Sequence, residues 1–308
     1  MSKSLVFGSE EHKKLLCRTF IDTHDPFKPE DIRWPDLDVE GLERLKSMPV
    51  WNEATRTEAA TAVKVQSLGD TEKDPLLAEA ISLQGYEEGR HADVLRLLTR
   101  HYGIPVMPFA EPEVPADPTR AFLRTGYGEC LDSFFAFGLF RLGVQAELFP
   151  KGLTDVFEQI MQEEARHILF IVNWAAYLRA RRPVALRPAF DLWRAWNIAA
   201  QAFDRLKGAL QMAGGADKKE KGAPEAAGAA ADRDQTQAGF TLKSHSVFGD
   251  FSLRSFLETC LAENERRLKP YDPRLLRPTL VPLVVRQVVR VLPRKSASRR
   301  KGSEEKAA

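Results

Sequence analysis

The sequence Glu-Glu-Gly-Arg-His at residues 87–91 recurs, with one change, as Glu-Glu-Ala-Arg-His at residues 163–167. In both copies the second glutamate stands three positions before the histidine. Residues three apart lie one above the other on the same face of an α-helix. Two such helices that face each other would therefore bring two carboxylates and two imidazoles to one point.

Start and stop signals place both motifs on long helices. Asp74-Pro75 and Asp117-Pro118 each combine an N-cap residue with a proline at the first helical position, and Asn52 and Thr154 are further N-cap candidates. Helical periodicity continues after each of these starts, and no strand-like alternation interrupts it. These patterns predict helices over about residues 52–68, 75–102, 118–148, 154–182 and 188–210.

The lengths of the connections predict how these helices pack. Short turns join the first helix to the second and the third to the fourth, whereas a longer proline-rich segment joins the second to the third. Short turns make antiparallel neighbours, and a long connection can cross a bundle. We therefore expect an all-α fold, a four-helix bundle with extra C-terminal helices.

Composition shifts suggest four segments along the 308-residue chain. Residues 1–47 are polar and punctuated by prolines, and we expect them to be irregular. Residues 48–211 form the helical bundle. Residues 212–238 are mostly Gly, Ala and charged residues, which cannot bury a core, and are expected to be a disordered linker. Residues 239–308 are expected to be a helical and basic tail.

Overall composition is that of a soluble globular protein, with 44% hydrophobic residues and a net charge of +2. Cys17, Cys130 and Cys260 form no CxxC pair, so neither a zinc knuckle nor a disulfide framework is expected. The N-terminus does not read as a secretory signal, and no apolar run reaches the roughly 20 residues of a membrane span. A cytoplasmic location follows as an expectation.

The basic excess of the chain is concentrated at its end. The segment from 280 to 292 is apolar but carries Arg286 and Arg290, and more lysines and arginines follow it. A basic amphipathic helix of this kind can lie on an anionic membrane. A short helix packed on the protein, or a frayed tail, is the alternative that we favour. Peripheral membrane contact through the basic C-terminal tail stays open.

Both motifs lie on largely apolar helix faces. Glu88 shares its face with Ile81 and Leu95, and Glu164 shares its face with Ile168. A charge on an inward apolar face is costly unless it is paired or binds a metal. Carboxylate oxygen and imidazole nitrogen together suit iron or manganese. One such pair is often only a solvated helix surface, but two pairs within the same longer string favour a metal site.

A metal site within a bundle predicts one more carboxylate from each remaining helix. Glu58 is the inward candidate on the first helix. Glu129 is the candidate on the third helix. It lies farther from the C-terminal end of that helix than Glu164 lies from the start of the fourth, so the two match less well in depth. A bend or an earlier helix end would remove the mismatch, and Asp132 and Glu147 are the alternatives.

This order of ligands resembles the ferritin-like di-iron carboxylate superfamily, which includes rubrerythrins, bacterioferritins and di-iron hydroxylases. The resemblance covers about residues 48–182. It implies that two iron ions, or manganese, are held by Glu58, Glu88, His91, Glu129, Glu164 and His167. It also implies that nearby carboxylates hydrogen-bond the two histidines, for which Glu87 and Glu163 are candidates. The alternative is that these two are solvated or form salt bridges to Arg90 and Arg166.

The function implied by the resemblance is that of an O₂-activating oxidoreductase of the hydroxylase or oxygenase type. It would act on an organic small-molecule or lipid-like substrate and take electrons from an electron-donor protein. The alternatives are peroxide reduction, a ferroxidase or iron-storage protein, and a non-enzymatic helical scaffold. The sequence assigns no catalytic residue beyond the metal ligands, and it leaves a homodimer open.

Overall fold

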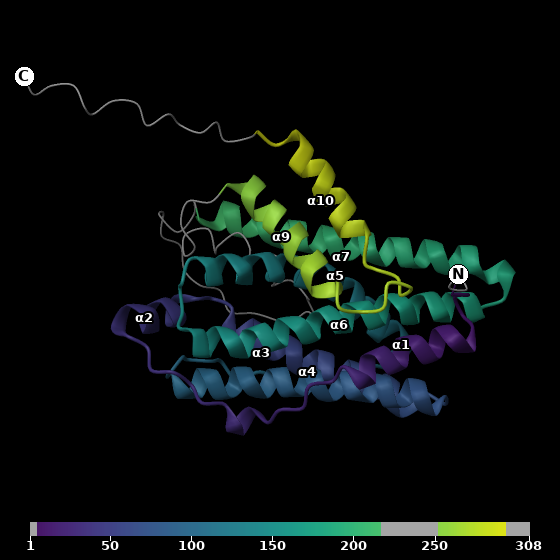
Figure 1. Ribbon diagram of the computed structural model, residues 1–308, viewed down its shortest axis with the longest axis horizontal. Coiled ribbons are helices and arrows are strands. Elements are labelled where there is room, and N and C mark those ends of the chain that lie inside the picture. Colours follow the sequence, from purple (N-terminus) through teal and green to yellow (C-terminus); the bar gives the residue numbers. More distant parts are fainter. Residues whose placement is uncertain (1–4, 217–251, 294–308) are drawn as a thin grey trace, which may run out of the picture.

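The computed structural model describes residues 5–216 and 252–293. Within these residues every regular element is a helix, so the predicted all-α class is confirmed (Figure 1). Both motifs lie on long helices as predicted. The four helices that carry the candidate ligands are α3 (Trp51–Thr71), α4 (Pro75–His101), α5 (Pro118–Gln145) and α6 (Lys151–Arg181).

The predicted start signals lie at the N-terminal ends of α4 and α5. The Asp74 carboxylate accepts hydrogen bonds from the backbone N–H groups of Leu76 and Leu77, and Asp117 accepts one from Arg120. These bonds satisfy amides that have no partner inside the helix. Each aspartate thereby fixes where its helix begins.

The four ligand-bearing helices pack around a common core. α3 lies along α4, α5 lies along α6, and further contacts join α3 to α5 and α4 to α6. In Figure 1, α4 lies at the bottom of this group of helices and α5 at its top, and α3 and α6 overlap between them. Their facing sides bury apolar side chains, including Val65, Ile81, Phe122, Ile168 and Trp174.

The prediction of an irregular segment over residues 1–47 is wrong. This segment contains α1 (Glu10–Asp22), the short 3₁₀ helix η1 (Pro29–Asp31) and α2 (Val39–Ser47). Ser9 caps α1, which buries Leu16 and Phe20 against α4 and α6. The apolar residues of α1 have helical spacing, but the prolines that follow outweighed this signal.

Among the described residues, three α-helices follow the ligand-bearing ones. After the 3₁₀ helix η2 (Val184–Leu186), α7 (Arg187–Ala216) packs on α5 and extends five residues into the predicted linker, whose remainder lies outside the described residues. α9 (Leu253–Leu268) also packs on α5, and α10 (Leu280–Val291) packs on α9. The described part of the C-terminal tail is therefore helical and docked.

α9 approaches α5 very closely at Gly138. A Cβ atom at this position would overlap the Sγ of Cys260 and would lie 3.0 Å from the Cα of Cys260. Cys260 is completely buried, and its neighbours Phe256 and Leu257 share an apolar cluster with Phe134 of α5. The missing side chain of Gly138 is thus what lets α9 cover α5.

Among the described helices, none has the length and apolar character that crossing a membrane requires.

We predict that Gly138→Ala destabilises the protein by about 1–3 kcal/mol, the usual cost of overpacking a core. Gly89→Ala is the matched control in the middle of α4, where the nearest atom to the added Cβ is 3.8 Å away. It should be neutral or stabilising, since alanine favours a helix over glycine. Thermal unfolding of both variants measures the difference, and equal melting temperatures would contradict the close contact of α9 with α5.

Candidate metal centre

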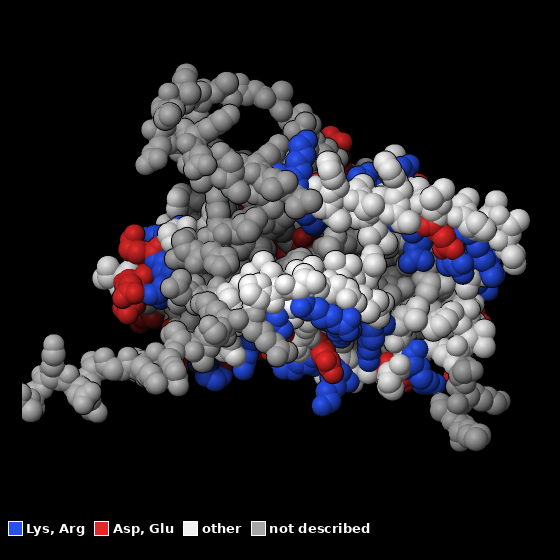
Figure 2. Space-filling model, turned by 90° about the horizontal axis from the view of Figure 1, so that it is seen from above, with Lys and Arg blue, Asp and Glu red and all other residues white. Residues whose placement is uncertain are grey.

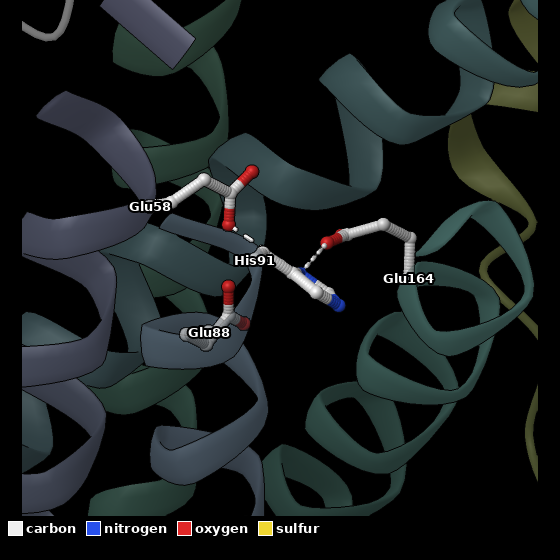
Figure 3. Close-up of side chains that lie close together, drawn as sticks. All are labelled: Glu58, Glu88, His91 and Glu164. Carbon is white, nitrogen blue, oxygen red and sulfur yellow. Dashed lines mark ion pairs between the residues drawn. The ribbon is translucent and has the colours of Figure 1, made fainter. Parts of the chain in front are cut away.

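The structure brings four of the six predicted ligands into one cluster (Figure 3). Glu58 comes from α3, Glu88 and His91 from α4, and Glu164 from α6. One potential ligand atom from each residue lies within 4.8 Å of the other three. His91 Nδ1 lies 3.5 Å from a Glu58 oxygen and 3.2 Å from a Glu164 oxygen.

The second histidine lies next to this cluster. His167 Nδ1 is 3.0 Å from Glu88 Oε1 and 3.8 Å from Glu164 Oε1. The rings of His91 and His167 are stacked, with centroids 5.6 Å apart. Both Nδ1 atoms therefore face the carboxylates, and Glu164 lies within reach of both histidines.

Glu129 is the sixth predicted ligand, and both of its carboxylate oxygens are buried without a hydrogen-bond partner among the described residues. Burial, with the negative charges of Glu88 and Glu164 nearby, raises its pKa well above the usual range. The alternative ligands have other surroundings: Asp132 forms an ion pair with Arg205 of α7, and Glu147 is exposed beyond the end of α5.

The mismatch in position along the helices is smaller in the structure than in the sequence. α5 ends at Gln145, three residues before the predicted end, and α6 begins at Lys151, three residues before its predicted start. Both shifts bring the depths of Glu129 and Glu164 closer together. An earlier helix end, one of the expected remedies, therefore accounts for much of the difference.

Two further carboxylates hold the histidines from the outside. His91 Nε2 lies 2.8 Å from Glu163 Oε2, and the other oxygen of Glu163 accepts a 2.6 Å hydrogen bond from Arg90. His167 Nε2 lies 2.9 Å from Glu87 Oε2, and the other oxygen of Glu87 accepts from Arg166.

The partners of these carboxylates are crossed between the two motifs. The first glutamate of each motif contacts both the arginine and the histidine of the other motif, so one contact pattern occurs twice across α4 and α6. The hydrogen bond to histidine and the salt bridge to arginine, which the sequence offered as alternatives, are thus both present. These contacts, with those of Glu88 and Glu164, give a role to every residue of the repeated pentapeptide except the middle one.

Neighbouring side chains complete these outer contacts. Glu87 also accepts from His24, which follows α1. The guanidinium of Arg90 lies 4.0 Å from the ring centre of Phe27, and that of Arg166 lies 4.7 Å from the ring centre of Phe20. The helical and extended parts of the N-terminal segment therefore cover the outer side of both ion pairs.

The outer and inner carboxylates differ in charge balance. Although burial opposes ionisation, His167, Arg166 and His24 together lower the pKa of Glu87 to about 2. Burial raises the pKa of Glu58 to about 8, assisted by the charges of Glu164 and Glu88 and opposed by His91. Among the described residues, no lysine or arginine forms an ion pair with Glu58, Glu88, Glu129 or Glu164.

The inner side chains fit a metal ion. Both Glu129 oxygens and both histidine Nδ1 atoms are buried without a hydrogen-bond partner within the described part of the chain. The Nδ1 atoms lie beside the carboxylates of Glu88 and Glu164, which form no ion pair with a lysine or arginine among the described residues. Oxygen and imidazole ligands of this kind are those of iron and manganese. The cluster can therefore hold a metal ion.

Comparisons of the chain with models of protein families, with curated proteins and with solved structures find no match.

We predict that Glu163→Gln weakens metal binding by about 10–100-fold, the usual effect of removing an outer hydrogen-bond partner from a metal-binding histidine. The amide cannot accept from both His91 and Arg90 as the carboxylate does. Metal titration followed by elemental analysis measures the effect, with circular dichroism as the test of folding. Glu53→Gln on α3, where Glu53 pairs with Arg56, is the matched control; equal loss in both variants would contradict a specific role for Glu163.

Proposed function

We propose that the chain is a ferritin-like di-iron carboxylate protein, in which α3, α4, α5 and α6 form the metal-binding bundle. The observation that carries this proposal is the arrangement of both histidine Nδ1 atoms toward shared carboxylates, with both Nε2 atoms held from behind by Glu163 and Glu87. Six ligand side chains from four helices, with a Glu-x-x-His pair on each of two of them, are the pattern of di-iron sites in bundles.

The outer carboxylates have a direct chemical consequence for the histidines. A carboxylate that accepts a hydrogen bond from Nε2–H keeps the proton on that nitrogen, which leaves the lone pair of Nδ1 available to a metal. The same bond fixes the orientation of the ring. Glu163 and Glu87 would in this way prepare His91 and His167 as ligands before a metal arrives.

Two iron ions would be held by Glu58, Glu88, His91, Glu129, Glu164 and His167, with manganese as the alternative metal. When bound, they would supply the reduction of O₂ coupled to oxidation of an organic substrate. The chain supplies a site that is largely dry: the His167 side chain is completely buried and that of Glu88 is 2% exposed. The Glu58 side chain is 18% exposed, so we place the approach of small molecules on the side of α3.

An oxidoreductase of the hydroxylase or oxygenase type is the function we favour. Iron storage in a closed shell requires subunits to pack through the outer surfaces of their bundles. In this chain α7 and α9 already cover α5 from the outside. A substrate, expected to be organic or lipid-like, and an electron-donor protein complete the proposed reaction.

We predict that protein loaded with Fe(II) without oxygen consumes O₂ in proportion to about two irons per chain, the number that such bundle sites hold. In excess Fe(II) the protein-dependent consumption of O₂ should stop at that amount, because a protein of the hydroxylase or oxygenase type does not store oxidised iron. An oxygen electrode measures the uptake, and Glu164→Ala should show only the background of free iron. Continued uptake with iron kept in solution would indicate storage instead, and no uptake by the wild-type protein would favour a scaffold.

A further inference from the structure

The helix α10 has a buried face and an exposed face, and both are apolar. Pro282, Val285 and Val289 are buried. Val285 and Val289 belong to one apolar cluster with Phe256 and Leu257 of α9. This face attaches α10 to the rest of the protein. The opposite face has no such partner among the described residues.

The exposed face of α10 carries large apolar side chains in a helical row. Leu280, Val284, Val288 and Val291 follow one another at intervals of three or four residues, and Leu283 is also exposed. Val284 is 56% exposed and Val291 is 83% exposed. Single exposed apolar residues are ordinary, but a contiguous row of them marks a surface that another apolar phase or partner covers.

Positive charge borders this row. Arg286 and Arg290 are exposed on α10, and neither forms an ion pair with a carboxylate among the described residues. The sequence has no acidic residue between Asp272 and Glu304, and after α10 it continues with Arg294, Lys295, Arg299, Arg300 and Lys301. An unbalanced cluster of cations therefore lies beside the apolar row and follows it in the chain.

Figure 2 looks down on the side of the molecule on which α10 is the outermost described helix in Figure 1. It shows an uncharged area in the centre, with lysine and arginine side chains along one border. The uncharged area and these basic side chains therefore lie on the same face of the molecule.

We propose that α10 docks this protein on an anionic lipid surface. The exposed valines and leucines would enter the boundary between head groups and acyl chains, while Arg286 and Arg290 would meet lipid phosphates at its edge. A twelve-residue helix is about 18 Å long, which suits a helix that lies in the plane of a membrane and does not cross it.

A second copy of the chain fits this surface less well. A twofold dimer through α10 places the same patch on both sides of the interface. Arg286 and Arg290 of one copy would then lie close to those of the other, and like charges across an interface are unfavourable. Anionic lipids supply the opposite charge. Docking by α10 does not require the metal centre, so a test of lipid binding is independent of the proposed di-iron site.

The test is co-sedimentation of the full-length protein with vesicles of phosphatidylcholine alone or mixed with phosphatidylglycerol. We expect binding to the anionic vesicles only, with binding falling as salt is added. Val284→Asp/Val291→Asp should abolish it, and Arg286→Gln/Arg290→Gln should weaken it at least about tenfold, given the attraction of each basic residue to anionic lipid. Val39→Asp, which changes an exposed valine of α2, is the matched control and should bind as the wild-type protein does.

Circular dichroism and iron content confirm that each variant is folded. The proposal is overturned if the wild-type protein ignores anionic vesicles, or if it binds uncharged vesicles equally well. It is also overturned if Val284→Asp/Val291→Asp binds undiminished, because the basic sequence alone would then account for attachment. A wild-type dimer that this double variant converts to a monomer, without vesicle binding, would assign the surface to a second copy.

Discussion

The crossed contacts of Glu87 and Glu163 are the constraint on which the rest of the site depends. Each of these buried carboxylates binds one histidine and one arginine from the helix opposite. Removing one member would leave a buried charge without its partner, which typically costs about 3–5 kcal/mol. A shift of α4 relative to α6 by a single residue would break all four contacts at once, so these contacts fix the register of the two helices.

That register decides where the inner ligands lie. Glu88 and Glu164 directly follow the crossed carboxylates in the sequence, and residues adjacent on a helix point about 100° apart. Glu88 and Glu164 therefore lie near the histidine Nδ1 atoms, whereas Glu87 and Glu163 contact the Nε2 atoms. The outer layer is balanced in charge by two arginines. The inner layer has four carboxylates and two imidazoles, with no arginine or lysine paired to it among the described residues. The protein thus builds a rigid frame around a site that lacks positive charge.

Local signals in the sequence predicted much of this arrangement. Asp74-Pro75 and Asp117-Pro118 gave helix starts that agree with α4 and α5, and the repeated motif with Glu58 anticipated the four-residue cluster. The helices of the N-terminal segment differ from the predicted irregular structure because the prolines at 26, 29 and 35 interrupt only the connection between α1 and α2 and the approach to α2. The packing of α9 on α5 does not follow from the local sequence, since it depends on the close approach of Gly138 and Cys260, two residues far apart in the chain.

The crossed pairing could not be predicted from the sequence for a related reason. Glu163 is four residues from its neighbour in the motif, His167, but its partner in space is His91, 72 positions earlier. Choosing between these two requires the relative direction and register of α4 and α6, which no local pattern contains. The position of Glu129 likewise depended on where α5 ends, and helix ends are the least certain feature of a sequence-based prediction.

The central claim is that the inner carboxylates and histidines bind metal, and metal content tests it most directly. Protein expressed in iron-replete medium should contain about two irons per chain, the number that bundle sites of this pattern hold. The His91→Ala/His167→Ala variant should contain almost none while keeping its helical circular dichroism. A folded wild-type protein without iron or manganese, or a variant that retains the full amount, would contradict the account.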